Sequence, residues 1–285
     1  MAGAEMMTAA PLLDVRDLHV TFPTRTRMIQ AVRGVTFALG KERLGIVGES
    51  GSGKSQTGRA ILGLTPYPGR VEAARLCFDG IDLLKADTRM WRSLRGSRMT
   101  MVMQDPKFSL NPVMRVGQQI IEAYRAHTPA TAGEARDKTL AMLEAVQIRD
   151  PRRVMRAYPH ELSGGMGQRA MIAMMLVTDP DLLIADEPTS ALDVTVQLQV
   201  LAILDRLVAE RGMGLIFISH DLRLVSSFCN RILVMYAGKV VEEVVASELS
   251  AARHPYTRGL LSCLPKIKGD VRPLPTLMRD AAWAE

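Results

Sequence analysis

Eight consecutive residues from Gly48 to Ser55, GESGSGKS, combine three glycines with a lysine and three serines. Glycines at this spacing let backbone N–H groups turn inward around phosphate oxygens, and a helix that begins after them adds the positive end of its dipole. Lys54 would contact the β- and γ-phosphates, and Ser55 would place its hydroxyl on Mg²⁺. The motif predicts a phosphate site formed by Gly48, Glu49, Ser50, Gly51, Ser52, Gly53, Lys54, Ser55 and Gln56.

A second motif, LLIADEP at residues 182–188, is an apolar strand that ends in two adjacent carboxylates. This arrangement places one acid on a metal ion and the other near the water that attacks a phosphate. We predict that Asp186 binds the metal and that Glu187 is the base or the residue that orients the water. By itself the pair could also be a solvated acidic turn, but the phosphate loop upstream favours the catalytic interpretation.

Residues 162–169, LSGGMGQR, closely resemble the LSGGQ signature of the ATP-binding cassette (ABC) ATPases, with Met166 where glutamine is usual. Gln104 in MVMQDP resembles the Q-loop of this family. The segment Ser190–Asp193 resembles its D-loop, and His220 in ISHD its switch histidine. The resemblance covers roughly residues 12–245.

The signature would open a helix, so that its backbone amides and the helix dipole form a second anion site. The resemblance implies a head-to-tail dimer with two ATP molecules between the subunits. In that dimer Ser163 and Gly165 touch the γ-phosphate held by the partner's phosphate loop. The resemblance also places Gly164, Met166 and Asp193 at the nucleotide.

Three single residues take their roles from the resemblance. His220 would contact the γ-phosphate and take part in catalysis, and Gln104 would join the metal or the water to the helical lobe. Phe22 would stack on adenine. Outside the family context a lone histidine or glutamine at a strand end is more often structural, and Phe22 could be an aromatic residue of the core or of an edge strand.

Met166, the D-loop sequence TSALDVTVQ and the segment HPYTRGLL at residues 254–261 resemble the subfamily that imports oligopeptides, dipeptides and nickel. The resemblance implies an ATP-hydrolysing subunit of an importer for peptides, with nickel, metal chelates or opine-like solutes as alternatives. ATP and Mg²⁺ would be its cofactors. Its partners would be a second ABC ATPase subunit, identical or not, two integral-membrane permease subunits and, indirectly, an extracytoplasmic solute-binding protein, at the cytoplasmic face of the inner membrane.

The net charge of +6 and the pI near 9.4 raise the possibility of a nucleic-acid partner. The first rival function is therefore a soluble ABC ATPase that acts on DNA or the ribosome. Such relatives carry two cassettes or long coiled coils, whereas this chain has one signature and no sustained heptads. The second rival is a phosphate-loop kinase or a non-hydrolysing module, and Glu187, His220 and the intact signature argue against both. We expect no nucleic-acid partner.

The elements that must position these motifs follow from hydrophobic periodicity. Two antiparallel strands are predicted at 12–22 and 30–39, and a helical lobe at about 105–178, in which Asp150 caps a helix before Pro151. The other predicted elements are a strand at 44–47, a helix at 54–64, and alternating strands and helices at 182–185, 194–211, 215–219, 222–228 and 232–236.

These elements predict an α/β fold class with an inserted helical lobe, and the resemblance implies an ABC ATPase nucleotide-binding domain with a RecA-like phosphate-loop core and an antiparallel β subdomain. This domain spans residues 12–245, and residues 246–285 form an appendage. From Gly238 onward the pattern predicts a turn, two short helical stretches and a proline-containing tail.

Composition bounds the remaining possibilities. The longest apolar run has eight residues, at 170–177, against the roughly 18 of a membrane span, and the start of the chain has no basic region. We therefore expect that the protein neither crosses a membrane nor is exported. Cys77, Cys229 and Cys263 lack the paired spacing of a zinc site, so we expect packing roles in a reducing compartment.

Overall fold

The computed structural model describes residues 10–103, 109–190, 192–263 and 283. Its central element is a six-stranded sheet in the order β11-β10-β3-β9-β8-β7, in which β11 is antiparallel to β10 and the other neighbours are parallel. Every residue of β9 is buried, as expected for a parallel strand covered on both faces. The strands are β3 (Arg43–Val47), β7 (Met99–Val102), β8 (Leu182–Asp186), β9 (Gly214–Ser219), β10 (Arg231–Tyr236) and β11 (Lys239–Val245).

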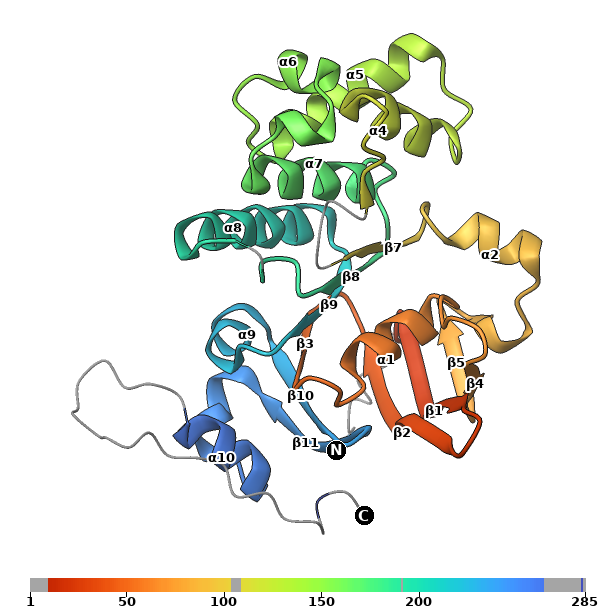
Figure 1. The fold of residues 1–285 in the computed structure, drawn as a ribbon, viewed down its shortest axis with the longest axis vertical. Helices are drawn as coiled ribbons and strands as arrows, with labels where there is room; N and C mark the ends of the chain where they lie inside the picture. The colour runs from red at the N-terminus through yellow and green to blue at the C-terminus, as the bar shows by residue number, and fades with distance from the viewer. Residues whose placement is uncertain (1–9, 104–108, 191, 264–282, 284–285) are drawn as a thin grey trace, which may run out of the picture.

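A second, antiparallel sheet lies beside the first (red to yellow in Figure 1). The strands predicted at 12–22 and 30–39 are confirmed as β1 (Leu13–Pro23) and β2 (Met28–Leu39), with Leu13 opposite Leu39. Three short strands escaped the sequence analysis, because runs of two to four residues show little periodicity. They are β4 (Arg70–Glu72), β5 (Arg75–Phe78) and β6 (Ile81–Asp82).

Helix α1 (Lys54–Ile61) contacts strands of both sheets, so the loop that precedes it is held by the core (Figure 1). The helix ends at Ile61 rather than at residue 64. Gly63 takes a left-handed backbone with φ +59° there, a conformation that ends many helices. The 3₁₀ turn η1 (Leu83–Lys85) and helix α2 (Thr88–Leu94) then lead to β7.

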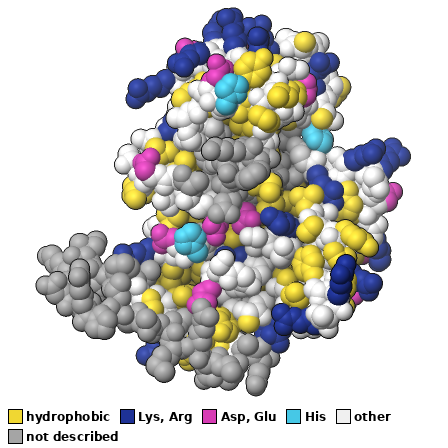
Figure 2. Space-filling model, in the orientation of Figure 1, with side chains coloured by type: hydrophobic (Ala, Val, Ile, Leu, Met, Phe, Trp, Pro, Cys, Tyr) yellow, Lys and Arg dark blue, Asp and Glu magenta, His cyan; other side chains and the backbone are white. Residues whose placement is uncertain are grey.

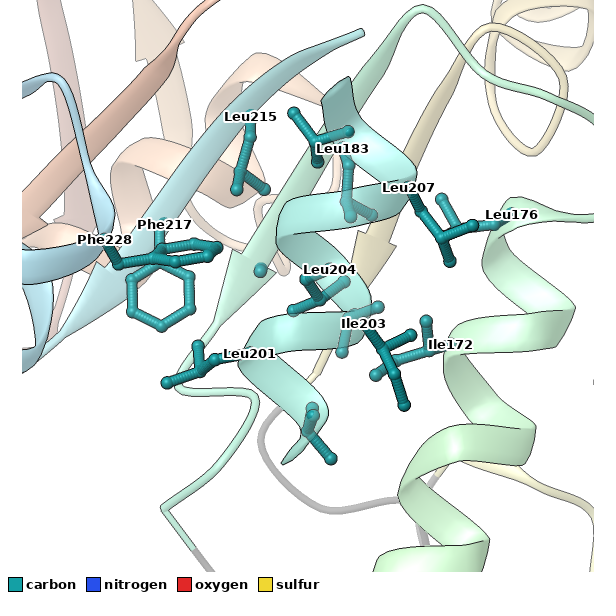
Figure 3. Packing of buried hydrophobic residues seen from close by; sticks show 14 of the residues in the cluster. Ile172, Leu176, Leu183, Leu201, Ile203, Leu204, Leu207, Leu215, Phe217 and Phe228 are labelled. Atoms are coloured by element: carbon teal, nitrogen blue, oxygen red, sulfur yellow. The ribbon is translucent and has the colours of Figure 1, made fainter. Parts of the chain in front are cut away.

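The opposite face of the parallel sheet is covered by helix α8 (Val194–Arg211), which packs in turn against α7 (Gly164–Leu176). Figure 3 shows Ile203 of α8 beside Ile172 of α7. Leu201 and Leu204 of α8 point instead toward the sheet (Figure 3). The helix that carries the signature thus contacts the catalytic core both through α8 and directly at β7.

The helical lobe lies at the end of the molecule away from the antiparallel sheet (Figure 1). It contains α4 (Val116–Arg125), α5 (Ala132–Ala145), α6 (Pro151–Arg156), the 3₁₀ turn η2 (Pro159–Glu161) and α7. The cap predicted before α6 is confirmed, since Asp150 accepts a 3.0 Å hydrogen bond from the backbone N–H of Arg153 and Pro151 is the first helical residue.

Positive charge gathers on the outer end of this lobe (dark blue at the top of Figure 2). Arg115, Arg136, Arg152 and Arg156 line a shallow pocket there, and none of them makes an ion pair with a described residue. Their side chains are exposed, and they contribute to the net charge of +6.

The chain after β10 differs from the prediction in one element. The turn expected after Gly238 is followed by strand β11, a half-exposed edge strand whose pairing is interrupted by a bulge at Val234/Met235, so its alternation is weak. The two helical stretches are η3 (Ala246–Ala251) and α10 (Pro255–Ser262), and α9 (Leu222–Phe228) precedes β10. Among the described residues no helix is long and apolar enough to cross a membrane.

Candidate nucleotide-binding site

The phosphate loop joins β3 to α1 and depends on glycine at two positions. Gly48 has φ +153°, and a Cβ atom on it would lie 2.2 Å from the carbonyl oxygen of Met235. Gly53 has φ +100°, and its Cβ atom would lie 2.4 Å from the carbonyl oxygen of Ala31. The loop is therefore pressed against β10 on one side and β2 on the other, where a side chain would collide with the backbone.

Lys54 lies inside the mouth of this loop. Its Nζ donates to the carbonyl oxygens of Gly48 at 2.7 Å and Glu49 at 2.8 Å, and the residue is 5% exposed. Burial lowers the pKa of Lys54, and nearby carboxylates, Glu187 first, oppose that shift. Phosphate oxygens would bind this ammonium group more strongly than the two carbonyls do, because the phosphate oxygens carry negative charge and the carbonyl oxygens are neutral.

Ser55 and Asp186 meet at the carboxyl ends of the strands. The hydroxyl of Ser55 donates to Oδ1 of Asp186 at 2.8 Å, and Asp186 is 6% exposed. Burial raises the pKa of Asp186, and the hydrogen bond from Ser55 offsets part of the rise. A hydroxyl and a carboxylate are the oxygen ligands that Mg²⁺ prefers, so these two residues fit the metal predicted for them. Gln104, the third predicted metal residue, lies outside the described residues.

Glu187 and His220 form a pair at the ends of β8 and β9. Nδ1 of His220 lies 3.3 Å from Oε1 of Glu187. The backbone of Glu187 is left-handed, with φ +47°, and its N–H donates to the carbonyl oxygen of Ile218 at 2.9 Å. An acidic residue in this backbone region is uncommon, and here a bond to the neighbouring strand holds the conformation. The carboxylate is thereby aimed at the histidine.

The signature and the D-loop lie side by side. Ser163 caps α7 by accepting from the N–H of Met166, and Asp193 caps α8 by accepting from the N–H of Val196 at 3.1 Å. A Cβ atom on Gly165 would lie 2.6 Å from Cγ1 of Val196. A pocket of about 590 Å³ is lined by Ser163, Gly164, Gly165, Met166, Leu192 and Asp193, among others.

Phe22 lies near the end of β1, half-buried, with its ring against Gly69 and its backbone opposite Ile29 of β2. Ala31, whose carbonyl approaches Gly53, is two positions further along β2. The aromatic ring is therefore on the part of the antiparallel sheet that borders the phosphate loop, and its contact with adenine stays a prediction.

Two residues of the site were not identified from the sequence. Gln168, 1% exposed, donates from Nε2 to the carbonyl oxygen of Pro188 and so links the signature helix to the segment after Glu187. Tyr256 of α10, fully buried, accepts a 3.1 Å hydrogen bond from the N–H of Glu49 in the phosphate loop. Both residues lie in motifs that the sequence analysis singled out, Gln168 in the signature and Tyr256 in HPYTRGLL. The sequence did not indicate the contacts that these two side chains make.

A parallel sheet with a phosphate loop and an acidic strand end, joined to a helical lobe that carries the signature, defines the ATPase cassette of an ABC transporter. The chain belongs to the ABC transporter family: the sequence model of that family matches residues 32–190, which is more than half of the chain. It is an ATP-binding and ATP-hydrolysing subunit, as are the cassettes of this family.

Three comparisons place the chain within this family. It is 48% identical over 257 residues to the dipeptide transport ATP-binding protein DppD of Haemophilus influenzae, covering 90% of this chain and 78% of that protein. It is 45% identical over 277 residues to the oligopeptide transport ATP-binding protein OppD of Salmonella typhimurium, covering 95% and 82%. Among solved structures, the dimeric post-hydrolysis state of the ATP-binding cassette MJ0796 bound to ADP and Pi matches with a TM-score of 0.72 at 26% identity, covering 82% of this chain and 98% of that chain.

Proposed function

We propose that this chain hydrolyses ATP to drive the import of peptides. The observation that carries the proposal is the 45–48% identity, along 90–95% of the chain, to ATP-binding proteins named for dipeptide and oligopeptide transport. We place the protein at the cytoplasmic face of the inner membrane, bound to two permease subunits and a second ATPase subunit. An extracytoplasmic solute-binding protein delivers the peptide to the permeases.

The proposed reaction begins with ATP in the phosphate loop, where Lys54 exchanges its loop carbonyls for the β- and γ-phosphate oxygens. Ser55 and Asp186, with Gln104 by resemblance, would hold Mg²⁺, which would supply positive charge beside the phosphates. Glu187 orients the attacking water and takes its proton. His220, 3.3 Å from Glu187, keeps that carboxylate in place and reaches toward the γ-phosphate.

The second half of each site comes from the partner subunit in this proposal. The N-terminus of α7 presents Ser163 and backbone amides to the γ-phosphate in the other subunit's loop. Asp193 at the adjacent cap brings the D-loop to the same interface. Support comes from the MJ0796 cassette, whose post-hydrolysis structure is dimeric. Closure around ATP excludes water, and hydrolysis lets the subunits separate.

Asp186→Asn is expected to make the nucleotide-free protein more stable at pH 7 and to remove Mg²⁺-dependent hydrolysis. The pKa of Asp186 is raised by burial, so its ionisation destabilises the fold above the folded-state pKa. This penalty shrinks as pH falls through that pKa and is absent below the ordinary value of 3.8. Asparagine keeps the acceptor for Ser55.

Thermal unfolding between pH 7 and pH 4 measures this effect, with Tm rising about 2–4 °C for each kcal/mol of penalty removed. The gain should be largest at pH 7. Asp137→Asn, at an exposed position of the helical lobe, is the control and should leave Tm unchanged. A Tm for Asp186→Asn at or below that of the wild type would contradict the assignment of a destabilising carboxylate.

Affinity purification of this chain from its native membranes tests the proposed function. Mass spectrometry of what copurifies should detect two integral-membrane proteins and a solute-binding protein. The thermal stability of that binding protein should then rise with dipeptides or short oligopeptides. A response to nickel, a metal chelate or an opine instead would replace peptides as the solute, and copurification of ribosomal or DNA-repair proteins without membrane proteins would refute the importer.

A further inference from the structure

Helix α10 lies outside the two sheets, against β10 and β11 (blue in Figure 1), yet it contributes the fully buried Tyr256. The ring of Tyr256 packs on that of Tyr236 of β10, with centroids 4.6 Å apart, and Trp283 lies 6.0 Å from both rings. This aromatic cluster directs the hydroxyl of Tyr256 toward the phosphate loop, where it accepts the 3.1 Å hydrogen bond from Glu49.

The backbone of Glu49 makes two hydrogen bonds, one to Tyr256 and one to Lys54. The N–H donates to Tyr256, and the carbonyl oxygen accepts from Nζ of Lys54 at 2.8 Å. The bond to Lys54 must weaken when the ammonium group turns to phosphate, whereas the bond to Tyr256 does not involve the nucleotide. We propose that Tyr256 is a positioning residue that holds the start of the phosphate loop in its binding conformation.

The position of Tyr256 is itself constrained from both sides. His254 caps α10 by accepting from the N–H of Tyr256 at 3.2 Å, and Pro255 occupies the first helical position. Glu242 of β11 accepts a 2.6 Å hydrogen bond from the N–H of Arg253, just before the helix. The edge of the parallel sheet thus anchors the helix start, and the helix start anchors the loop. A group fixed in this way can hold a binding loop without rearranging itself.

The alternative is that Tyr256 only completes the packing around β10 and β11. Its buried ring contributes to stability in either case, but the two roles differ in what the hydroxyl does. Packing depends on the ring, which Tyr256→Phe keeps. Positioning depends on the bond to Glu49, which that variant removes.

The test compares Tyr256→Phe with Tyr236→Phe in the purified full-length chain. Each variant removes one hydroxyl from the same cluster, and the described part of the chain offers the hydroxyl of Tyr236 no hydrogen-bond partner. We expect Tyr256→Phe to raise the Kd and KM for ATP about 2- to 10-fold, the effect of one hydrogen bond, with kcat at saturating ATP changed less. Tyr236→Phe should leave both constants unchanged.

Hydrogen exchange of the peptide that contains the Glu49 amide gives an independent reading. In the nucleotide-free protein this amide should exchange slowly in the wild type and in Tyr236→Phe, and faster in Tyr256→Phe. Equal ATP affinity in Tyr256→Phe and the wild type would overturn the proposal, as would an equal loss in both variants. So would unprotected exchange of the Glu49 amide in the wild type.

This inference rests on the nucleotide site of the proposed function and not on the solute. Failure of the wild-type chain to bind ATP would refute that site. An unchanged Tyr256→Phe variant beside a wild type that binds ATP would refute the role of Tyr256 alone.

Discussion

Glu187→Gln is expected to lower ATP turnover by about 10²- to 10⁴-fold while ATP still binds. The amide keeps the size of the side chain and its place opposite His220, but it cannot take a proton from the attacking water. The phosphate loop and Asp186 are unchanged, so nucleotide affinity should persist. Because hydrolysis ends the closed state, the variant should also accumulate a dimer with ATP trapped between the subunits.

Phosphate release at saturating ATP measures turnover, and size-exclusion chromatography with and without ATP measures the trapped dimer. Glu210→Gln is the matched control, because it makes the same substitution at an exposed position near the end of α8. It should behave as the wild type. Turnover of Glu187→Gln within a few-fold of the wild type would remove Glu187 from the role of base, and lost ATP affinity would show that its charge serves binding instead.

Lys54→Met is expected to lower ATP affinity by roughly 100-fold or more. The buried ammonium group is the cation in the mouth of the phosphate loop, and it would make at least two charge-assisted hydrogen bonds to phosphate oxygens. At about 1.5–3 kcal/mol each, two such bonds amount to about 3–6 kcal/mol, and giving up the two carbonyl bonds of the free loop offsets part of this, which leaves roughly 3 kcal/mol or about 100-fold in Kd. Methionine keeps the buried aliphatic stem but removes the cation that interacts favourably with Glu187 and Asp186.

Equilibrium binding of a fluorescent ATP analogue measures the effect. Lys41→Met, at an exposed position before β3, is the control and should bind as the wild type does. Thermal unfolding of the nucleotide-free Lys54→Met protein separates an effect on ATP affinity from an effect on folding. Burial lowers the pKa of Lys54, which means that its charged form is disfavoured in the folded protein, so the substitution should not unfold the chain. Unchanged ATP affinity in a folded Lys54→Met protein would refute the phosphate-loop assignment.

Together the two variants separate binding from hydrolysis. Lys54→Met should bind ATP weakly, whereas Glu187→Gln should bind ATP and not hydrolyse it. Tyr256→Phe should weaken ATP binding only in part, because the hydrogen bond that it removes holds the phosphate loop and does not contact the nucleotide.

Much of the fold was predictable because its signals are local. Alternation over ten or more residues predicted β1 and β2, and continuous apolar runs predicted β8 and β9. The helix cap at Asp150 was predictable because aspartate is a common capping residue and a proline follows it at the first helical position. The strands that escaped were short, as in β4 to β7, or half-exposed at a sheet edge, as in β11. Two to four residues are too few to show a period even where most of them are buried, as in β5 and β7, and in β11 the residues are mostly half-exposed.

The sequence by itself determined the glycine-rich loop, the helix after it, the acidic strand end and the signature, because each depends on residue types within a few positions. The tertiary structure decided which of these meet. Ser55 bonds to Asp186, 131 positions later, and Glu49 to Tyr256, 207 positions later. Such contacts depend on strand order in the sheet and on how a terminal helix packs against its edge, and local periodicity describes neither, since it reports which face of an element is buried and not against what.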